Sequence, residues 1–243
     1  MIIKFLGTAS GMPELNKRHS CLYVKKDGIS CLIDCGEGAS QAFLEEAIDI
    51  EELDFVFISH YHPDHISGLF MLLQLFYIKQ RRKNLRIFLP EQIEQFRKTM
   101  DLFYMYRERF YKEIELLTCE SISEYYPWIT TFKTDHLLGY KSIIGEEELR
   151  DRLSSYGVNI RDNDKIVAYP SDIKSVDSIV KNIEDADVLI IEGIHPPAHE
   201  FLQLEAIVKD CIYLIHGITE ELDILVKDRK KFRTVRERDI IEI

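Results

Sequence analysis

Long hydrophobic runs and a cysteine framework are both missing from this sequence. No apolar stretch approaches the ~20 residues that a helix needs to span a bilayer, and the opening segment, residues 1–7, is too short for the core of a signal peptide. The five cysteines are an odd number and contain no Cys-x-x-Cys pair, which argues against disulfides and against a cysteine zinc knuckle. We therefore expect reduced, mostly buried thiols, no membrane contact and a cytoplasmic location.

Internal repeats, low-complexity tracts and Pro/Ser-rich linkers are also absent, so one domain over residues 1–243 is predicted. Hydrophobic residues make up 46% and charged residues 30% of the chain, which is ordinary for a folded globular protein. The formal net charge of −11 argues against a protein whose whole surface binds nucleic acid. Basic clusters at 79–86 and 227–238 leave a local patch open, although solvated helix faces or tails explain them as well.

Apolar runs broken by turn residues alternate with helical spacing along the chain, which predicts α/β layers. Strands are expected at residues 2–6, 20–25, 30–34, 54–59, 85–89, 129–134, 165–169, 188–191 and 211–215. Helices are expected at residues 38–46, 68–83, 91–111, 146–155 and 176–182. His60, Asp172 and His216 each follow the end of an expected strand, where a rigid scaffold can collect ligands.

A dense group of metal-ligand side chains occupies residues 59–65, Ser-His-Tyr-His-Pro-Asp-His. In an extended segment His60 and His62 project to the same side, because the side-chain period is two, and Asp64 and His65 can turn toward a neighbouring point. Neutral imidazole nitrogen and carboxylate oxygen suit zinc, and also manganese or iron. Three of the eight histidines fall here, directly after an apolar strand. The cluster is therefore predicted to bind metal and to keep a position open for water.

This His-x-His-x-Asp-His motif resembles that of the metallo-β-lactamase superfamily. Upstream lie Leu-Ile-Asp-Cys-Gly-Glu-Gly at 32–38 and Phe-Leu-Gly-Thr-Ala-Ser-Gly-Met-Pro at 5–13, followed by Lys-Arg-His-Ser at 17–20. Within the superfamily this opening is similar to tRNase Z, the endonuclease that trims tRNA 3′ ends, and to related phosphodiesterases. The resemblance spans nearly the whole chain. It implies an α/β fold with four αββα layers, in which two mixed sheets have helices on their outer faces.

The resemblance also implies which residues hold the metals. Beyond the motif, the family has a histidine before a Gly-aromatic pair, an aspartate that ends a strand and a histidine that ends a late strand. The sequence matches these features, in order, with His136, Asp172 and His216. One metal would be held by His60, His62 and His136. The other metal would be held by Asp64, His65 and His216. Asp172 would bridge both metals, and Asp34 would orient a ligand histidine.

Such a centre implies a metal-dependent hydrolase with two divalent ions, zinc in first place and manganese or iron as alternatives. Two ions ~3.5–4 Å apart can share a hydroxide and supply a nucleophile near neutral pH. Asp64 is then a catalytic residue, and His199 is the candidate donor of the leaving-group proton, with His195 as the alternative. His62 stands where the oxygen-reducing di-iron branch typically has glutamate, which favours hydrolysis over redox chemistry.

The substrate is less closely defined by the resemblance. Lys17 and Arg18 are candidates for contacting a substrate phosphate. The long Gly/Pro-rich arm of tRNase Z is not predicted, because only residues 141–164 could hold it, and His19 stands where asparagine would be expected. We expect a phosphodiester substrate, either a small molecule or RNA, and a homodimer is one candidate oligomeric state. Hydrolysis of a thioester or lactone is the alternative activity, and an inactive metal-binding module is a third interpretation.

Overall fold

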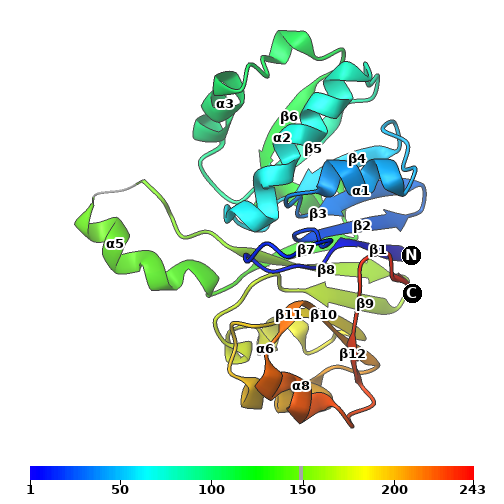
Figure 1. The fold of residues 1–243 in the computed structure, drawn as a ribbon, viewed down its shortest axis with the longest axis vertical. Helices are drawn as coiled ribbons and strands as arrows, with labels where there is room; N and C mark the ends of the chain where they lie inside the picture. The colour runs from blue at the N-terminus through cyan, green and yellow to red at the C-terminus, as the bar shows by residue number, and fades with distance from the viewer. Residues whose placement is uncertain (148–149) are drawn as a thin grey trace. The chain divides into compact units, whose positions relative to one another are not determined.

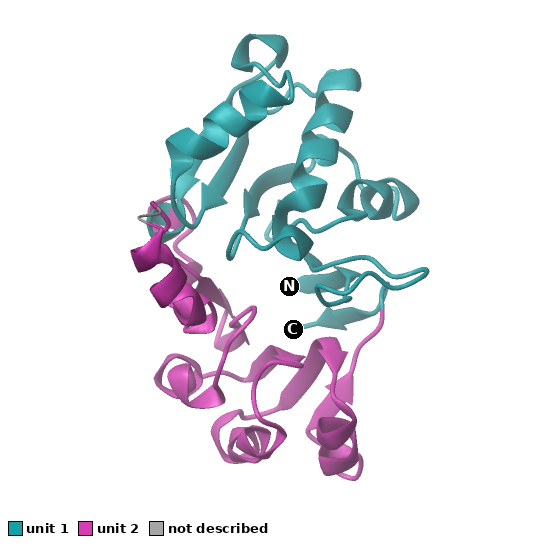
Figure 2. Cartoon of the chain, turned by 60° about the vertical axis from the view of Figure 1, so that its left-hand side comes forward, with its two compact units in different colours: residues 1–121, 237–243 teal, residues 122–236 magenta. Residues whose placement is uncertain are grey.

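The computed structural model describes residues 1–147 and 150–243, and the chain divides into two compact units. Unit 1 comprises residues 1–121 and 237–243, and unit 2 comprises residues 122–236 (Figure 2). Each unit is built on its own sheet (Figure 1). The organisation of residues 1–243 as a single domain stays a prediction. Of the helices described, none has the length and apolar character required to cross a bilayer.

Unit 1 contains a mixed seven-stranded sheet in the order β13-β1-β2-β3-β4-β5-β6. Its strands are β1 (Ile2–Gly7), β2 (Cys21–Lys26), β3 (Ile29–Ile33), β4 (Leu53–Phe57), β5 (Leu85–Leu89), β6 (Ile114–Thr118) and β13 (Ile240–Glu242). The neighbouring strands β13, β1, β2 and β3 pair antiparallel with one another in this order. The neighbouring strands β3, β4, β5 and β6 pair parallel. Three α-helices and two short 3-10 helices accompany them, α1 (Ala39–Glu45), α2 (Pro63–Ile78), α3 (Ile93–Leu102), η1 (Arg107–Arg109) and η2 (Cys119–Ser121). The short helix α4 (Ile122–Tyr125) begins unit 2.

The core of unit 1 lies between one face of this sheet and the helices. Leu32 and Val56 from the sheet pack in one cluster with Phe43 from α1 and with Leu69 and Leu73 from α2. Each of these side chains is fully buried or nearly so, and burial of one such side chain contributes about 1.5–3 kcal/mol. The core therefore holds α2, whose first turn carries part of the predicted metal motif, firmly against the sheet.

Unit 2 contains a mixed six-stranded sheet in the order β12-β11-β10-β9-β8-β7. Its strands are β7 (Ile129–Lys133), β8 (Tyr156–Asp162), β9 (Lys165–Tyr169), β10 (Val188–Gly193), β11 (Cys211–Ile218) and β12 (Phe232–Thr234). Its helical segments are η3 (His136–Tyr140), α5 (Lys141–Glu146), η4 (Val176–Ser178), α6 (Val180–Ile183), η5 (Ala198–Gln203), α7 (Leu204–Ile207) and α8 (Glu220–Val226). Val176, Phe201 and Leu222 from these segments pack against Ile191 and Leu214 of the sheet, whereas α5 projects from the unit (Figure 1).

All nine expected strands are present, whereas β6, β8, β12 and β13 were not expected. Several helices differ from the expectation, and the differences have local causes. Helix α2 begins at Pro63 rather than at residue 68, because the fixed φ of proline suits the first helical position. Helix α3 ends at Leu102, well short of residue 111, and Tyr104 has a positive φ of 58°. The helix expected at 146–155 is wrong for the described residues, since α5 ends at 146 and residues 150–155 are not helical; residues 148 and 149 lie outside the described ranges. Strand β8 was not predicted.

Two glycines allow the start of α2 to cross the loop after β3 at very short range. A Cβ on Gly68 would lie 1.9 Å from the carbonyl oxygen of Gly36, and a Cβ on Gly36 would lie 2.1 Å from the carbonyl oxygen of Asp64. The amide of Cys35 donates to the carbonyl of His65 at 2.8 Å. Neither glycine can therefore carry a side chain unless the backbone moves, and the crossing fixes the first turn of α2.

The cysteines behave as predicted. All five are free and buried. Burial raises the pKa of the Cys31, Cys35 and Cys119 thiols well above the ordinary value. They are therefore neutral core side chains rather than nucleophiles or metal ligands.

Candidate metal centre

The first turn of α2 and the loop before it hold four of the predicted ligands. His60 Nε2 lies 3.1 Å from His62 Nδ1, and His65 Nε2 lies 3.4 Å from Asp64 Oδ2. The His60 and His65 rings have centroids 4.2 Å apart. Both histidines are fully buried, and Asp64 is 9% exposed. Because Pro63 starts the helix, Asp64 and His65 lie in its first turn, in keeping with the expectation that they turn away from the line of His60 and His62.

Asp34 supports this half of the centre. It follows β3 with a positive φ of 59° and is fully buried. Its carboxylate accepts hydrogen bonds from the Ser59 amide at 2.8 Å, the Ser59 hydroxyl at 3.0 Å and His65 Nδ1 at 2.8 Å. Since Nδ1–H of His65 donates to Asp34, Nε2 of that ring carries the lone pair that a metal requires. The contact is the one expected of a residue that orients a ligand histidine.

The other three predicted ligands, His136, Asp172 and His216, lie together in unit 2. Asp172 follows β9. Asp172 Oδ2 lies 3.3 Å from His216 Nε2 and 3.7 Å from His136 Nε2. His216 lies inside β11 and not after a strand, contrary to the expectation. Its φ of 59° and the φ of 84° at Gly217 accompany a register shift between β10 and β11. Such an irregularity re-aims a strand side chain, and it brings His216 to Asp172.

A further pair in the same unit, Glu192 and His195, lies beside these ligands. Atoms of His136, Asp172, Glu192 and His195 all lie within 4.8 Å of one another. Glu192 is 1% exposed and accepts from His195 Nδ1 at 2.7 Å and from the amide of Ile173 at 2.8 Å. The sequence analysis missed Glu192, although an acid inside the apolar run of β10 is a signal, because a buried charge requires partners.

The two candidate proton donors, His195 and His199, lie in different surroundings, and the candidate phosphate contacts, Lys17 and Arg18, both form ion pairs. His199 is exposed on η5 and is not among the residues grouped with Asp172, whereas His195 is 3.8 Å from that carboxylate. Lys17 is exposed and pairs with Glu14 at 2.7 Å.

Arg18 is committed to carboxylates within unit 1. Its two terminal nitrogens bind Glu237 at 2.8 Å and Glu45 at 2.6 Å. The guanidiniums of Arg18 and Arg238 lower the pKa of Glu45. This placement favours a structural role for Arg18 over contact with a substrate phosphate.

The family model described as Anti-Pycsar protein Apyc1 matches residues 1–240. The chain belongs to the Apyc1 family. Curated relatives named Ribonuclease Z, from Saccharolobus solfataricus and Sulfurisphaera tokodaii, are 27% and 24% identical to it over 221 residues. The alignments cover 77% of this chain and 74% and 73% of those proteins.

Solved structures match this Apyc1 family member along its whole length. Human tRNase Z, short form, has a TM-score of 0.73 at 18% identity and covers 100% of this chain and 99% of its own. The metallo-beta-lactamase fold protein YhfI from Bacillus subtilis has a TM-score of 0.75 at 24% identity and covers 99% of each chain. These likenesses confirm the predicted metallo-β-lactamase fold. With the ribonuclease Z relatives, they confirm the predicted branch and its class, a metal-dependent hydrolase.

The donor set of this Apyc1 family member fits divalent metal ions. In unit 1, two imidazole nitrogens 3.1 Å apart are accompanied by a carboxylate beside a third imidazole. In unit 2, two imidazoles face one carboxylate oxygen. Nitrogen and oxygen donors of this kind suit zinc, manganese and iron, and no cysteine takes part because the thiols are buried and neutral.

Asp34→Asn should weaken divalent metal binding by roughly 10- to 100-fold, because an amide cannot replace a carboxylate that accepts from His65 and Ser59 together. Titration of metal-free protein against a chromophoric chelator measures the affinity. Asp27→Asn is the matched control, since Asp27 lies in a surface turn with a positive φ of 49° and pairs with Lys26. Equal affinities for wild type and Asp34→Asn would remove Asp34 from the support of the centre.

Proposed function

We propose that this chain is a cytoplasmic two-metal phosphodiesterase that cleaves a small phosphodiester, such as a cyclic nucleotide, rather than tRNA precursors. The hydrolase class and the branch give the reaction type. The observation that carries the choice of a small substrate is that several basic side chains in both candidate RNA-binding clusters pair with carboxylates or main-chain carbonyls of this chain. The free thiols suit a reducing compartment.

The cluster at 79–86 is engaged by unit 1 itself. Arg81 is 6% exposed, and its guanidinium donates to main-chain carbonyls, among them that of Asn84 at 3.0 Å. Lys83 pairs with Asp54 at 2.8 Å, and Arg86 pairs with Glu115 at 3.0 Å. These cations therefore brace the sheet and its loops.

The cluster at 227–238 is engaged in the same way. Arg229 pairs with Glu205, and Lys231 donates to the main-chain carbonyl of Val208 at 2.7 Å. Arg238 pairs with Glu45 at 2.6 Å. A protein that binds a long polyanion needs many cations facing the phosphates. With a net charge of −11, this chain is better suited to a substrate that carries one phosphodiester.

The ligand assignment rests on the family resemblance together with the two half-sites. We propose that one ion is held by His60, His62 and His136. The other ion is held by Asp64, His65 and His216, and Asp172 bridges both. Zinc is the expected metal, because imidazole and carboxylate donors without thiolate suit an open catalytic zinc site. When bound, two such ions lower the pKa of a shared water and neutralise charge on the phosphoryl group.

The protein should hydrolyse bis-p-nitrophenyl phosphate and a cyclic nucleotide, lose both activities in chelator, and cleave a pre-tRNA weakly. Asp64→Ala should abolish turnover while the protein stays folded. Assays across a salt series add a second criterion, because a large RNA loses affinity by roughly one power of salt per phosphate contact, whereas a small diester should show a shallow slope.

Other outcomes of this panel would favour the other interpretations. Efficient, salt-sensitive cleavage of pre-tRNA would assign the RNA substrate. Turnover of a thioester or lactone without diester cleavage would assign the alternative hydrolase. Two bound metals without any turnover would favour the inactive module.

For the leaving-group proton, the contacts favour His195 over His199. Glu192 fixes the His195 ring by accepting from Nδ1, so Nε2 is the nitrogen directed away from that carboxylate. The ring lies among the unit 2 ligands, 5.0 Å from the centroid of His136. His195 is also 40% exposed at its side chain, which leaves it accessible to a substrate.

His195→Ala should reduce turnover of a diester with a poor leaving group by roughly 10²-fold or more, while a p-nitrophenyl ester, whose leaving group needs no proton, changes little. His199→Ala should leave both rates close to wild type. The ratio of the two rates, measured for each variant, identifies the donor. A selective loss with His199→Ala instead would restore the assignment made from the sequence.

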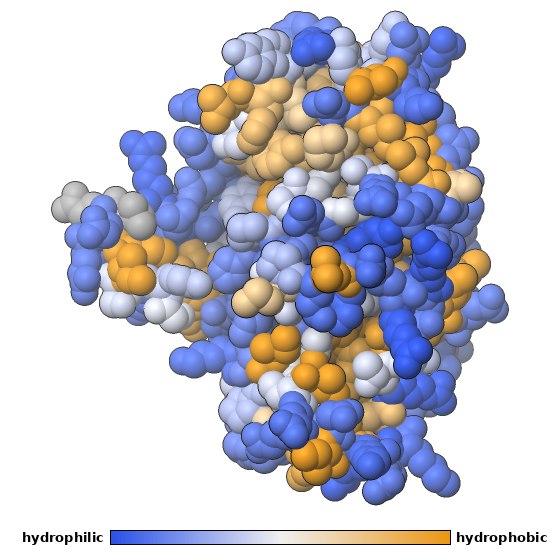
Figure 3. Space-filling model, viewed as in Figure 1, coloured by the Kyte–Doolittle hydropathy of each residue, from blue (hydrophilic) through white to orange (hydrophobic). Residues whose placement is uncertain are grey.

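We also propose that two copies of the chain associate through an apolar surface on unit 1, defined by Ile78, Leu102, Phe103 and Tyr104. Figure 3 shows patches of hydrophobic side chains on the part of unit 1 that holds α2 and α3. Leu102 is 74% and Tyr104 68% exposed. A groove of about 400 Å³ beside them is lined by Tyr77, Ile78, Phe103 and Phe110, among others. The groove lining also includes Gln74 and Arg109. A two-fold interface requires one patch to complement itself, and projecting apolar side chains next to a partly apolar groove meet that requirement.

Sedimentation velocity should therefore give twice the mass of one chain. Leu102→Glu should shift the protein to monomer, because it places a charge in the apolar interface. Ile224→Glu is the control, since Ile224 is 69% exposed on α8 of unit 2. A monomeric wild type at micromolar concentration would refute this interface.

A further inference from the structure

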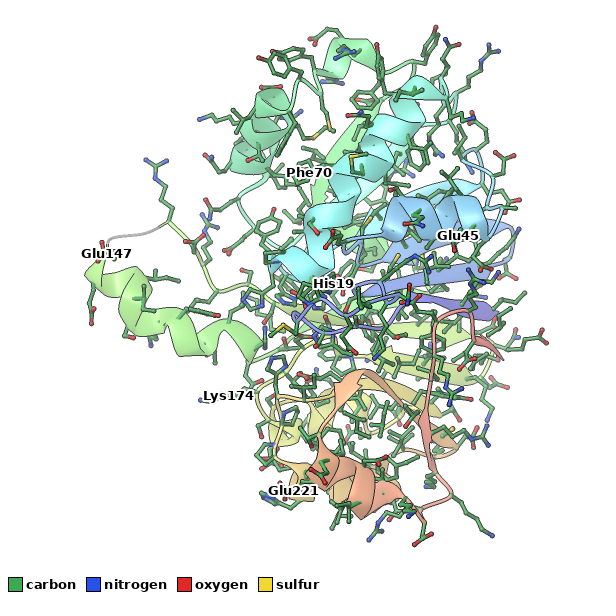
Figure 4. The ribbon with its side chains drawn as sticks, in the orientation of Figure 1. His19, Glu45, Phe70, Glu147, Lys174 and Glu221 are labelled. Carbon is green, nitrogen blue, oxygen red and sulfur yellow. The ribbon has the colours of Figure 1, made fainter. Side chains whose placement is uncertain are left out.

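His19 lies where three segments of unit 1 meet, below the first turn of α2 in the view of Figure 4. It is 6% exposed. Its amide donates to the carbonyl of Glu37 at 3.1 Å, and it forms an isolated bridge with Ala9. A Cβ on Gly36 would lie 2.6 Å from the Cβ of His19. The residue is therefore fixed between the loop after β1 and the loop after β3.

The His19 ring is directed at the loop after β1. Nδ1 lies 2.7 Å from the carbonyl oxygen of Ser10, and Nε2 lies 3.8 Å from the Glu37 carboxylate. A carbonyl oxygen only accepts hydrogen bonds, so Nδ1 is the nitrogen that carries the hydrogen. Only this nitrogen is within hydrogen-bond distance of the loop.

The next residue in the loop, Gly11, lies close enough to Asp64 that a side chain at this position would contact the carboxylate. A Cβ on Gly11 would be 3.6 Å from Oδ2 and 3.7 Å from Cγ of Asp64, which is ordinary van der Waals contact. Residues 11–17 are exposed to solvent. The amide of Ala9 donates to the carbonyl of Arg18 at 2.8 Å before the exposed stretch begins. The position of Gly11 beside Asp64 therefore depends on how Ser10 is held.

We propose that His19 is a positioning residue that acts through Ser10 and Gly11 on Asp64. The Nδ1–H bond holds the Ser10 carbonyl, and the Gly11 backbone then limits the orientations open to the Asp64 carboxylate. An exposed loop without this bond regains conformational freedom, and Asp64 loses its neighbour on that side. The inference rests on the proposed function for the role of Asp64, as a ligand and a catalytic residue.

The test uses two amide substitutions that differ in where the donor lies. In His19→Asn the amide nitrogen takes roughly the place of Nδ1 and can still donate to Ser10. In His19→Gln the amide nitrogen takes roughly the place of Nε2 and faces Glu37 instead. His19→Asn should retain most of the turnover and the metal affinity. His19→Gln and His19→Ala should lose turnover by on the order of ten- to a hundredfold with KM within about twofold of wild type, because small misplacements at a catalytic group are costly.

A readout that needs no substrate accompanies the kinetics. Zn²⁺ titration of the metal-free variants should show weaker binding of the second equivalent in His19→Gln and His19→Ala, but not in His19→Asn. Glu37→Gln replaces the carboxylate near Nε2 by a neutral amide and is the control expected to match wild type in both assays. Thermal unfolding identifies any variant that fails to fold, and if His19→Gln fails, the comparison of Asn with Ala decides.

Equal behaviour of the Asn and Gln variants would overturn the role of His19, whether both match wild type or both are impaired. A wild type that cleaves no phosphodiester would refute the proposed function instead. The titration would still show whether the Nδ1 donor controls metal binding at Asp64.

Discussion

In each unit, a buried carboxylate binds both a backbone amide and a histidine ring beside the candidate metal ligands. In unit 1 it is Asp34, which joins Ser59 to His65. In unit 2 it is Glu192, which joins Ile173 to His195. An ionised group is costly to bury unless it is fully hydrogen-bonded, so each carboxylate holds its surroundings in one arrangement. In unit 1 this carboxylate orients the ligand His65, and in unit 2 it orients His195, the proposed proton donor.

The close backbone crossing in unit 1 works together with Asp34. Because Gly36 and Gly68 carry no side chain, the loop after β3 can contact the first turn of α2. His65 is then held from two sides, by its carbonyl through Cys35 and by its ring through Asp34. The Gly11 segment packs on Asp64 from the loop after β1. The loops after β1 and β3 therefore converge on two consecutive residues, which explains how a short motif becomes a rigid donor group.

The distribution of cations explains why the choice of substrate does not follow from composition. The sequence contains basic clusters that could bind RNA, but the structure uses Arg81, Lys231 and Arg238 to satisfy carbonyls and carboxylates of the fold. Arg18 likewise pairs with two carboxylates of the fold, those of Glu45 and Glu237. Local sequence shows that a charge is present, whereas only packing shows whether that charge is directed at solvent. The proposal that the centre serves a small diester depends on this second kind of information.

The sequence by itself determined the metal motif, the superfamily and most strands, because ligand spacing and apolar runs are local properties of the chain. It also indicated Asp34 through the family resemblance.

Tertiary structure decided the rest. Strand β8 contains Gly157, Asn159 and Arg161, which are poor strand formers, and it exists because β7 and β9 pair with it on both sides. His216 reaches Asp172 through an irregularity inside β11, and His195 is near that carboxylate because the buried Glu192 binds its ring. Some of these placements depend on hydrogen bonds between residues that are far apart in the chain. Others depend on side chains that become buried only when the chain folds. No local sequence pattern encodes either.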